Sequence, residues 1–487
     1  MFLTILPVLL LYLLYKYLLH PYFFSPLSPI PNAHPTSPIT SQWITSKRSH
    51  TQEVHAIYAA HRRSGPIIRL APNELSINSL SGLRTIYTGA FEKHPFYSDA
   101  FINFQTPNLV GMLSNQPHAQ QKRMLSSVYA KSYLQNSMDM RVFSRHILWE
   151  RLFPILQNLV RTGATVNVLP LFQAVGMDFT SAFLFGLGHS TRYLSDLGAW
   201  MNWLDEYERF KHQSREKRYR GFIESWCLGL CESVQGPSQT EADVPATEAV
   251  VFDRLKAGLE KSPDERPLDL AIASELLDHL VAGHETSGIT FTYMMWEMSK
   301  WPELQARLRG ELASVKGSLR YGGRDEELPP LAEIDGLPLL DAIVRETLRL
   351  HAPAPAQLPR VTPPEGTWLH GYRIPGGVQV SSSAYSLHRI EEVFPSPEEW
   401  IPSRWLDVED GKIHDMRKLF WAFGSGGRMC LGSNFALLEI KLVMAAVYAN
   451  YTTKVVDDEG IEQNMEFIAL PQGRKLVVRF VPVEGGA

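Results

Sequence analysis

One cysteine, Cys430, lies among four glycines and one arginine in the stretch FGSGGRMCLG. A cysteine binds a metal strongly only as the thiolate, which backbone N–H donors and nearby positive charge stabilise. Glycine permits the turns that aim amides at a sulfur atom, and it lets the backbone approach a large flat cofactor. Arg428 can pair with an acidic group on such a cofactor. The stretch therefore predicts a cofactor-binding loop with Cys430 as the metal ligand, and the rest of the chain must fold around it.

The spacing FxxGxRxCxG, from Phe423 to Gly432, resembles the haem-binding loop of the cytochrome P450 superfamily. The resemblance implies heme b, with Cys430 as the axial ligand of the iron and with Phe423, Gly424 and Arg428 beside the cofactor. No CxxCH motif occurs, so nothing indicates covalently attached haem. The alternative interpretation is a Gly-rich loop with a buried free thiol.

A second motif, ETLR, places Glu346 and Arg349 three residues apart on one face of a predicted helix. Such a pair alone is weak evidence, but a Pro-rich stretch follows it, and the segment IPSRW supplies Arg404 further on. In the family that the chain resembles, the matching residues form a buried ion network that supports the haem loop. Loss of one member would leave a buried charge unpaired, so the resemblance implies a structural role for all three.

The segment AGHETS, Ala282 to Ser287, lies in a long apolar stretch with helical periodicity. Gly283 lowers helix stability, which suggests local widening of the helix for a bound diatomic molecule. The segment resembles the oxygen-activation motif of the same family. The resemblance implies that Thr286 hydrogen-bonds dioxygen, that Glu285 relays protons, and that the thiolate opposite favours cleavage of the O–O bond. The alternative is an ordinary pair of polar residues inside a helix.

The stretch NQPHAQQKRMLSSVY resembles the family helix that carries a propionate-binding W-x-x-x-R motif. The matching positions here are His118 and Lys122, both of which can donate to a carboxylate, and Arg123 can share this role. Arg360, in LPRVT, matches a second propionate-binding arginine. An ordinary surface histidine is the alternative for His118.

The N-terminus, MFLTILPVLLLYLLYKYLLHPYF, is almost entirely apolar from Phe2 to Leu19. As a helix this stretch is roughly 27 Å long, close to the hydrocarbon thickness of a bilayer. It lacks the basic start and the small-residue cleavage site of a signal peptide. Cations occur only at Lys16 and beyond, which predicts a cytosolic body.

These features predict a single-pass anchor in the endoplasmic reticulum membrane at residues 1–20 and a Pro-rich, extended and stiff hinge at residues 21–44. The remainder, residues 45–487, is predicted to be one haem-thiolate monooxygenase domain, because motifs from His118 to Gly432 would meet at one haem. A polar stretch from Ser233 to Ala249 is expected to be a mobile surface loop.

Most of the body has helical periodicity, and short alternating stretches such as IIRLAPNELSIN and WLHGYRIPGGVQVSSSA predict strands. The expected fold is mainly α with a minor β part, a cytochrome P450 fold with one large haem domain behind a transmembrane helix. Lys and Arg total 47 against 51 Asp and Glu, which offers no basic field for nucleic acid. No GxGxxG follows a predicted strand and no GxxxxGK[ST] occurs, so reducing equivalents must come from a partner.

The resemblance implies a monooxygenase that inserts one atom of dioxygen into a hydrophobic small molecule. The tryptophan-rich body and the segment SPLSPIPNAHPTSP resemble filamentous-fungal members that tailor secondary metabolites, which favours a polyketide, terpenoid or alkaloid intermediate. The expected partners are NADPH–cytochrome P450 reductase, docked near Lys131 and Lys418, and cytochrome b5. Three alternatives remain open at this stage: a haem-thiolate isomerase or dehydratase, an enzyme of oxidative coupling or desaturation, and a non-catalytic haem sensor or electron carrier.

Overall fold

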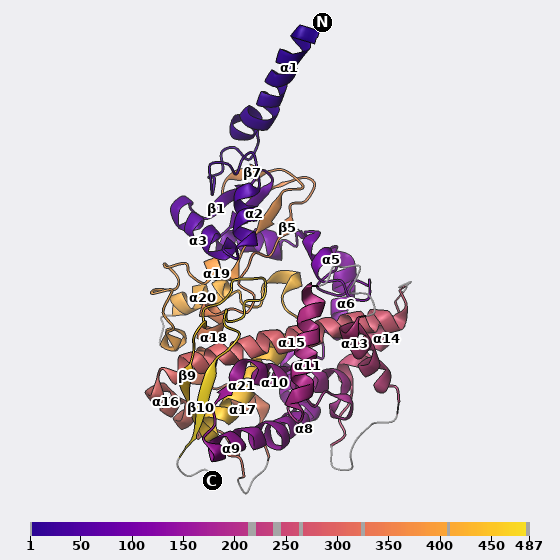
Figure 1. Ribbon diagram of the computed structural model, residues 1–487, viewed down its shortest axis with the longest axis vertical. Coiled ribbons are helices and arrows are strands. Elements are labelled where there is room, and N and C mark those ends of the chain that lie inside the picture. The colour runs from indigo at the N-terminus through magenta and orange to yellow at the C-terminus, as the bar shows by residue number, and fades with distance from the viewer. Residues whose placement is uncertain are drawn as a thin grey trace.

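The computed structural model describes residues 2–212, 221–236, 245–262, 266–322, 327–406 and 410–483 (Figure 1). Helices make up most of the body, and three small sheets lie at its margins. The prediction of a mainly α protein with a minor β part is confirmed. The central part of the predicted loop from Ser233 to Ala249 lies outside the described residues.

The helices follow one another in this order: α1 (Phe2–Leu14), η1 (Tyr15–Phe24), α2 (Gln42–Ser49), α3 (Glu53–Ser64), α4 (Leu80–Leu83), η2 (Arg84–Thr88), α5 (Phe96–Ala100), α6 (Asn115–Leu125), α7 (Lys131–Asn136), α8 (Met138–His146), η3 (Ile147–Leu152), α9 (Phe153–Thr162), α10 (Val168–Phe185), η4 (Leu187–His189), α11 (Leu197–His212), α13 (Phe222–Ser233), α14 (Val250–Leu259), α15 (Leu268–Ser299), α16 (Pro302–Leu312), α17 (Leu331–Asp335), α18 (Pro338–Leu350), α19 (Ala384–Leu387), η5 (Pro402–Trp405), α20 (Asp410–Leu419), η6 (Gly426–Arg428) and α21 (Ser433–Asn450). The strands are β1 (Ile67–Ala71), β2 (Glu74–Ile77), β3 (Glu92–Lys93), β4 (Val166–Asn167), β5 (Arg360–Val361), β6 (Thr367–Leu369), β7 (Tyr372–Ile374), β8 (Gln379–Ser381), β9 (Tyr451–Asp457) and β10 (Val477–Pro482).

The largest sheet has the strand order β1-β2-β8-β5-β3, and the others are β4-β10-β9 and the hairpin β6-β7. Both stretches that the sequence predicts as strands are in these sheets. The short antiparallel pair β3-β5 places Lys93 directly opposite Arg360. Two cations in cross-strand register repel each other, so this pairing indicates that something nearby balances their charge.

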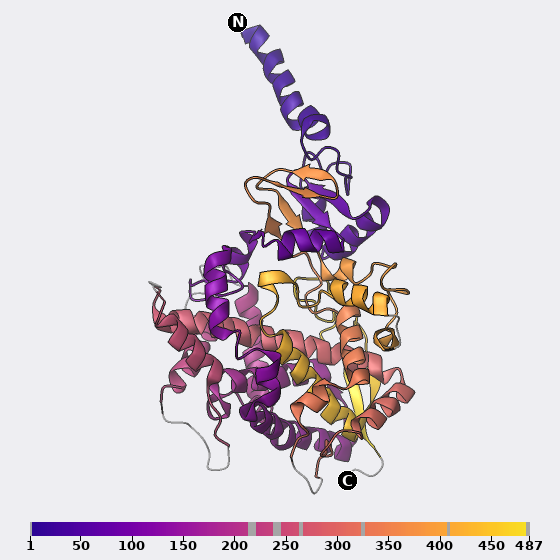
Figure 2. The same cartoon turned by 180° about the vertical axis from the view of Figure 1, so that it is seen from behind.

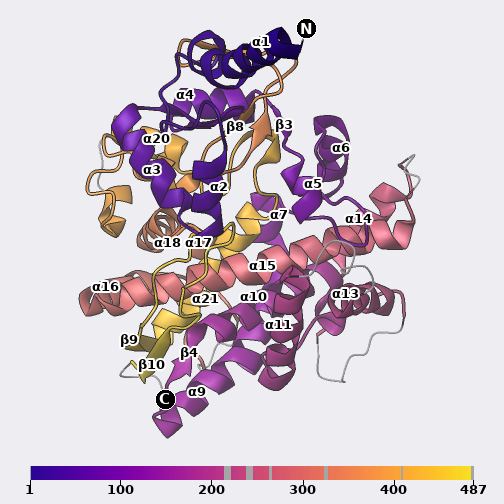
Figure 3. The same ribbon diagram turned by 45° about the horizontal axis from the view of Figure 1, so that its top comes forward.

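Helix α15 crosses the middle of the body, with α10 packed along it (Figure 3). Its glycines make close packing possible: a Cβ on Gly283 would collide with the side chain of Thr180, and one on Gly288 would collide with Gln173. The helix is regular α throughout, so the widening expected at Gly283 is wrong. The glycine is required by the close approach of α10 instead.

The N-terminal helix continues past residue 20, the predicted end of the anchor. Helix α1 leads directly into η1, a π-helical stretch that contains Pro21 and ends at Phe24. The 20 residues from Ile5 to Phe24 have a mean hydropathy of 1.3, and none of them is buried. Figures 1 and 2 show this helix projecting from the body. It is a candidate membrane anchor, whereas α10, which has similar length and composition, is buried in the core.

The Pro-rich segment that follows forms consecutive turns against strand β1, so the prediction of an extended connector is wrong. Leu27 and Ile30 are buried in a hydrophobic cluster of the body. The Arg69 N–H donates to the Pro31 carbonyl at 2.8 Å, and Arg69 Nη1 donates to the Pro21 carbonyl at 3.0 Å. Burial of the apolar residues between the prolines outweighs the tendency of proline to keep the backbone extended.

Candidate active site

The cysteine loop is closed by its own backbone. The Cys430 N–H donates to the Phe423 carbonyl at 2.9 Å, and the Gly424 N–H donates to the Trp421 carbonyl at 3.0 Å. Gly424 and Gly426 have φ values of 69° and 67°, which residues with a Cβ rarely adopt. The sequence therefore needs glycine here for the turn itself.

The Cys430 side chain is exposed although it lies in the interior of the fold. Enough protein surrounds it that burial raises the thiol pKa, while the Gly432 N–H and the Lys122 charge act to lower that pKa. A side chain that is densely surrounded and still accessible faces a cavity. The first turn of α21 follows at Ser433, so the positive end of that helix also favours the thiolate.

One face of α15 is also accessible in the interior of the fold. Between Ala271 and Met295 nearly all its side chains are buried, and the accessible residues are Asp278, His279, Val281, Ala282, Gly283 and Thr286. Ala282 is the most exposed of these residues. Thr286 donates through Oγ1 to the Ala282 carbonyl at 2.8 Å. The Asp278 charge also raises the Cys430 pKa, so this face of α15 lies within electrostatic range of the thiol.

Glu285 is bound by α11 and not by its neighbour Thr286. Tyr207 donates to Glu285 Oε2 at 3.0 Å, and Lys211 donates to Oε1 at 2.9 Å. Adjacent residues of a helix point about 100° apart, which explains why Glu285 and Thr286 have different neighbours. Burial and the Glu285 charge together raise the pKa of Tyr207 well above its ordinary value.

Five cationic or potentially cationic side chains gather beside the cysteine loop. They are Lys93, His118, Lys122, Arg360 and Arg428. Among the described residues none of the five forms an ion pair with a carboxylate. Sequence reasoning singled out four of them and missed Lys93, because its two-residue strand carries almost no pattern.

Each of these five groups disfavours the positive charge of its neighbours. Burial, together with the charges of Arg428, Lys93, Lys122 and Arg360, lowers the pKa of His118 to about 3. Burial and the Arg360 charge lower the Arg428 pKa to about 10, and burial with both arginines lowers the Lys93 pKa well below its ordinary value. A cluster of this kind is stable only beside an anion, and the two carboxylates of haem meet that requirement.

The individual contacts show how the cluster is held. Arg360 Nη1 lies 3.2 Å from the Tyr97 hydroxyl, and its guanidinium lies 5.0 Å from the centroid of the Tyr87 ring. Arg428 donates to the carbonyls of Met112 and Leu113, both at 2.7 Å. Because protein atoms fix these side chains, they form a preorganised site for an anionic group.

Lys122 also binds the backbone of the cysteine loop, a contact that the sequence did not indicate. Its ammonium donates to the carbonyls of Gly427 and Met429, at 3.0 and 2.6 Å. An ammonium has three donors, so one remains for a carboxylate. Lys122 thus braces the cysteine loop from α6, with His118 one helical turn before it.

The three residues Glu346, Arg349 and Arg404 meet in the interior. Arg349 donates to both carboxylate oxygens of Glu346, at 2.8 and 2.9 Å, and Arg404 Nε donates to Oε1 at 2.9 Å. Trp405 Nε1 donates to Oε2 at 2.9 Å. Burial acts to raise the Glu346 pKa, but Arg349 and Arg404 outweigh it, so the pKa is lowered overall.

His388 connects this network to the cysteine loop, and sequence reasoning missed it. Its Nδ1 lies 2.8 Å from the Arg349 carbonyl and therefore carries the proton, while Nε2 accepts from the Trp421 N–H at 2.8 Å. The ring stacks on Phe420 with an interplanar angle of 9°. No local sequence pattern marks a histidine with this role, because its partners come from two distant segments.

Two other cavities lie outside this site. One of about 1070 Å³ borders the C-terminal end of α15 and is lined in part by Trp296, Lys300 and His351. Another of about 340 Å³ lies beside the first turns of α21 and is lined in part by Lys131 and Arg417. Neither is lined by Cys430 or Thr286, so neither is the cavity between the cysteine loop and α15.

Comparison with known proteins places the site in context. Residues 198–478 match the family model described as Cytochrome P450. The chain is 31% identical over 401 residues to Cytochrome P450 monooxygenase avaI of Aspergillus versicolor, an alignment that covers 78% of this chain and 94% of that protein. It is 25% identical over 484 residues to Cytochrome P450 monooxygenase orf2 of Aspergillus niger, covering 92% and 93% of the two chains. Cytochrome P450 monooxygenase FGM1 of Gibberella zeae is 27% identical over 444 residues, with 86% of each chain covered.

Proposed function

Because the chain belongs to the cytochrome P450 family, we propose that it is a monooxygenase that inserts one atom of dioxygen into a hydrophobic small molecule. The observation that carries this proposal is an accessible thiol, Cys430, within electrostatic range of the α15 face that carries Thr286, beside five cationic groups that have no carboxylate partner among the described residues. Members of this family use heme b with a cysteine thiolate ligand, and the donor set fits it. When bound, that cofactor supplies the oxygen-activating chemistry.

The chain's own residues have separable tasks in this proposal. Cys430 ligates the iron, with the Gly432 N–H and the Lys122 charge favouring its thiolate form. Arg360, Arg428 and His118 bind the two carboxylates of the cofactor, with Lys93 adding positive charge. Thr286 presents a hydroxyl to the cavity from the accessible face of α15.

Proton supply is assigned to Glu285. Its partner Lys211 also bonds Glu208 at 2.7 Å, and Glu208 bonds Arg474 at 2.9 Å on the surface. This succession of charged groups runs from solvent to the helix turn that carries Thr286. Movement of the half-buried Lys211 would free the Glu285 carboxylate to pass a proton inward.

Electrons are proposed to come from NADPH–cytochrome P450 reductase, with cytochrome b5 as a second donor. The two lysines first expected to dock it are both paired: Lys131 with Asp335 at 2.7 Å and Lys418 with Asp415 at 3.3 Å. Arg417 is exposed on the same face without an ion pair among the described residues, and it lines the cavity beside α21. Arg417 is therefore the better candidate for contact with an acidic partner surface.

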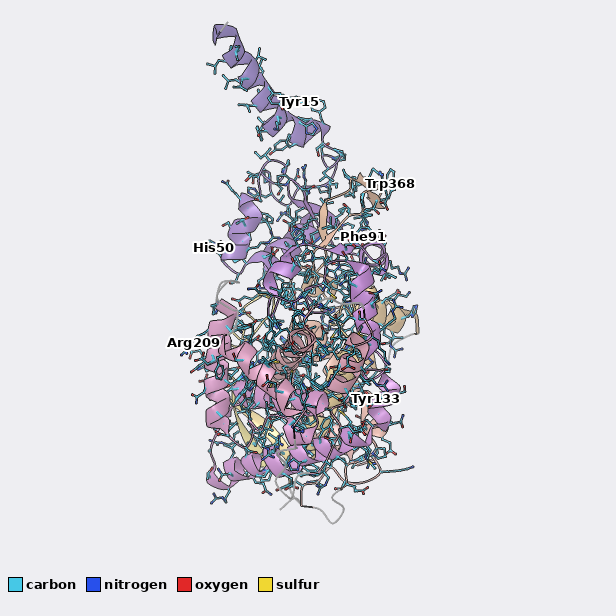
Figure 4. The ribbon with its side chains drawn as sticks, turned by 90° about the vertical axis from the view of Figure 1, so that its right-hand side faces the viewer. Tyr15, His50, Phe91, Tyr133, Arg209 and Trp368 are labelled. Atoms are coloured by element: carbon cyan, nitrogen blue, oxygen red, sulfur yellow. The ribbon has the colours of Figure 1, made fainter. Side chains whose placement is uncertain are left out.

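The apolar N-terminal helix is proposed to anchor the enzyme in the endoplasmic reticulum membrane, with the body in the cytosol. Trp368, in the β6–β7 hairpin, is 64% exposed and lies at the same end of the molecule as Tyr15 of the apolar helix (Figure 4). Tryptophan favours the interface between water and lipid, so this arrangement supports a membrane beside that end. The fungal relatives favour a secondary-metabolite intermediate as the substrate.

The test is co-expression of the full-length chain with a reductase in a host, followed by comparison of metabolites with and without Cys430→His. We expect a new product that carries one atom from labelled dioxygen, and no such product from the variant. The variant should also lose the spectrum of a thiolate-ligated carbon monoxide adduct. An isomer, a dehydrated product or a coupled product without label would contradict oxygen insertion, and a spectrum unchanged in Cys430→His would exclude Cys430 as the ligand.

A further inference from the structure

The accessible face of α15 carries a carboxylate, that of Asp278. Asp278, Ala282 and Thr286 follow one another at intervals of four residues and therefore share one face of the helix. All three have accessible surface in the middle of a helix that is otherwise buried. Among the described residues, Asp278 makes no hydrogen bond and no ion pair.

The neighbouring acid on the same helix shows that this lack of partners is particular to Asp278. Glu275 accepts from the Leu109 N–H at 2.9 Å, from Gln121 at 2.6 Å and from His279 at 3.1 Å. Glu275 therefore holds Leu109 and Gln121 against α15, and both of its oxygens are bonded to protein. Asp278, one turn further along, has no such bond to any residue that the structure describes.

The surroundings of Asp278 disfavour its negative charge. Burial and the Glu275 charge raise its pKa to about 7, and His279 and Lys93 act to lower it. Tyr207 of α11 and Cys430 also lie within its electrostatic range. The Lys93 ammonium donates to the Val110 carbonyl at 2.7 Å and faces the Tyr97 ring at 4.4 Å, so it is not an ion-pair partner of Asp278.

From this placement we propose that Asp278 binds a protonated amine on the substrate, which makes it a specificity-determining residue of this enzyme. The inference rests on the proposed function and narrows its substrate class to a lipophilic molecule with a basic nitrogen. A carboxylate in apolar surroundings needs an opposite charge and a hydrogen-bond donor, and a protonated amine supplies both.

The helix also sets the length of that molecule. Eight residues at about 1.5 Å each put the Cα atoms of Asp278 and Thr286 roughly 12 Å apart. Ala282 lies between them with a small exposed side chain, which leaves room for a hydrocarbon framework. The oxidised carbon is therefore expected on the order of 10 Å from the amine nitrogen.

The test compares two probes of the same shape on the haem-loaded enzyme without reductase or NADPH. One is N,N-dimethyl-4-phenylbutan-1-amine, and the other is its carbon isostere (5-methylhexyl)benzene. Equilibrium dialysis at pH 7.5 gives the Kd of each for the wild type, for Asp278→Asn and for the charge-conserving Asp278→Glu. Asp269→Asn is the matched control, because Asp269 is exposed in the first turn of the same helix.

We expect the wild type to bind the amine at least about tenfold more tightly than the isostere. Asp278→Asn should lose this preference, while Asp278→Glu and Asp269→Asn should keep it. The Kd of the isostere should stay within about twofold in all proteins, which would show that the cavity is intact. No preference in the wild type, or a preference that survives Asp278→Asn, would overturn the proposal. These measurements need no turnover, so absence of oxygen insertion would contradict the proposed function and leave this result standing.

Discussion

His388 accepts a hydrogen bond of 2.8 Å from the backbone N–H of Trp421. Its other ring nitrogen is bound to the Arg349 carbonyl, so one neutral imidazole joins the ion network of α18 to the start of the cysteine loop. This geometry requires an unprotonated Nε2. The stability of the loop should therefore depend on pH.

Replacing His388 with leucine should flatten the pH dependence of stability. Burial lowers the His388 pKa from 6.5 to about 3, so in acid the unfolded chain takes up this proton first. The free energy of unfolding should thus decrease as pH falls below 6.5, by about 1.4 kcal/mol per pH unit for one histidine. Urea denaturation between pH 4.5 and 7.5 measures this. His388→Leu should be less stable at pH 7.5 with a shallower slope, whereas the exposed His50→Leu should keep the wild-type slope.

Removing Arg349 should damage folding far more than removing its neighbour Arg345. Arg349→Ala leaves the buried Glu346 with one arginine in place of two, at an expected cost of about 3–5 kcal/mol. Arg345 pairs with Asp341 on a partly exposed surface, so Arg345→Ala should cost at most about 1 kcal/mol. Haem content and urea denaturation measure the difference, and equal losses from the two variants would contradict a special role for the network.

Replacing Thr286 with alanine should uncouple electron use from product formation. Haem binding should be unchanged, because Thr286 contacts no member of the cation cluster. A larger share of the consumed NADPH should appear as peroxide, by about tenfold relative to product. Thr292→Ala is the matched control, because Thr292 makes the same bond to the carbonyl four residues earlier but is buried. Equal coupling in the two variants would remove Thr286 from the mechanism.

Charge reversal at Arg417 should weaken binding of the reductase. Arg417→Glu should raise the reductase concentration for half-maximal turnover several-fold at low salt, and the effect should shrink as ionic strength rises. Lys454→Glu, at an exposed position of β9, serves as the control. Reductase titrations at two salt concentrations measure both. If the two variants behave alike, the docking face lies elsewhere.

Much of the site could be predicted from sequence because its parts are local patterns. The cysteine loop owes its shape to glycines at fixed spacing, and Glu346 and Arg349 meet because a helix repeats every 3.6 residues. Lys93 and Arg360 come together through strand pairing across distant segments, which no local pattern records. Asp278 was missed for a related reason: an acid in an apolar helix has no evident importance until its lack of partners is visible.

The expectations that were wrong concern packing. Gly283 suggested a widened helix, but it is required by the approach of α10. The prolines suggested an extended, stiff connector, but leucine and isoleucine between them are buried in the body. In both cases tertiary contact decided between conformations that the local sequence allows.

The hydrogen bond from Arg69 to the Pro21 carbonyl restricts the motion of the segment between the apolar helix and the body. A flexible tether would let the body sample many tilts and depths above a lipid surface, as polymer statistics dictate. Here the last turn of the apolar helix is fastened to the first strand of the largest sheet, so a rotation of one is transmitted to the other. The angle at which the site would face the bilayer is then limited by the Arg69 side chain together with the buried Leu27 and Ile30, and replacing Arg69 with methionine would remove one of these constraints.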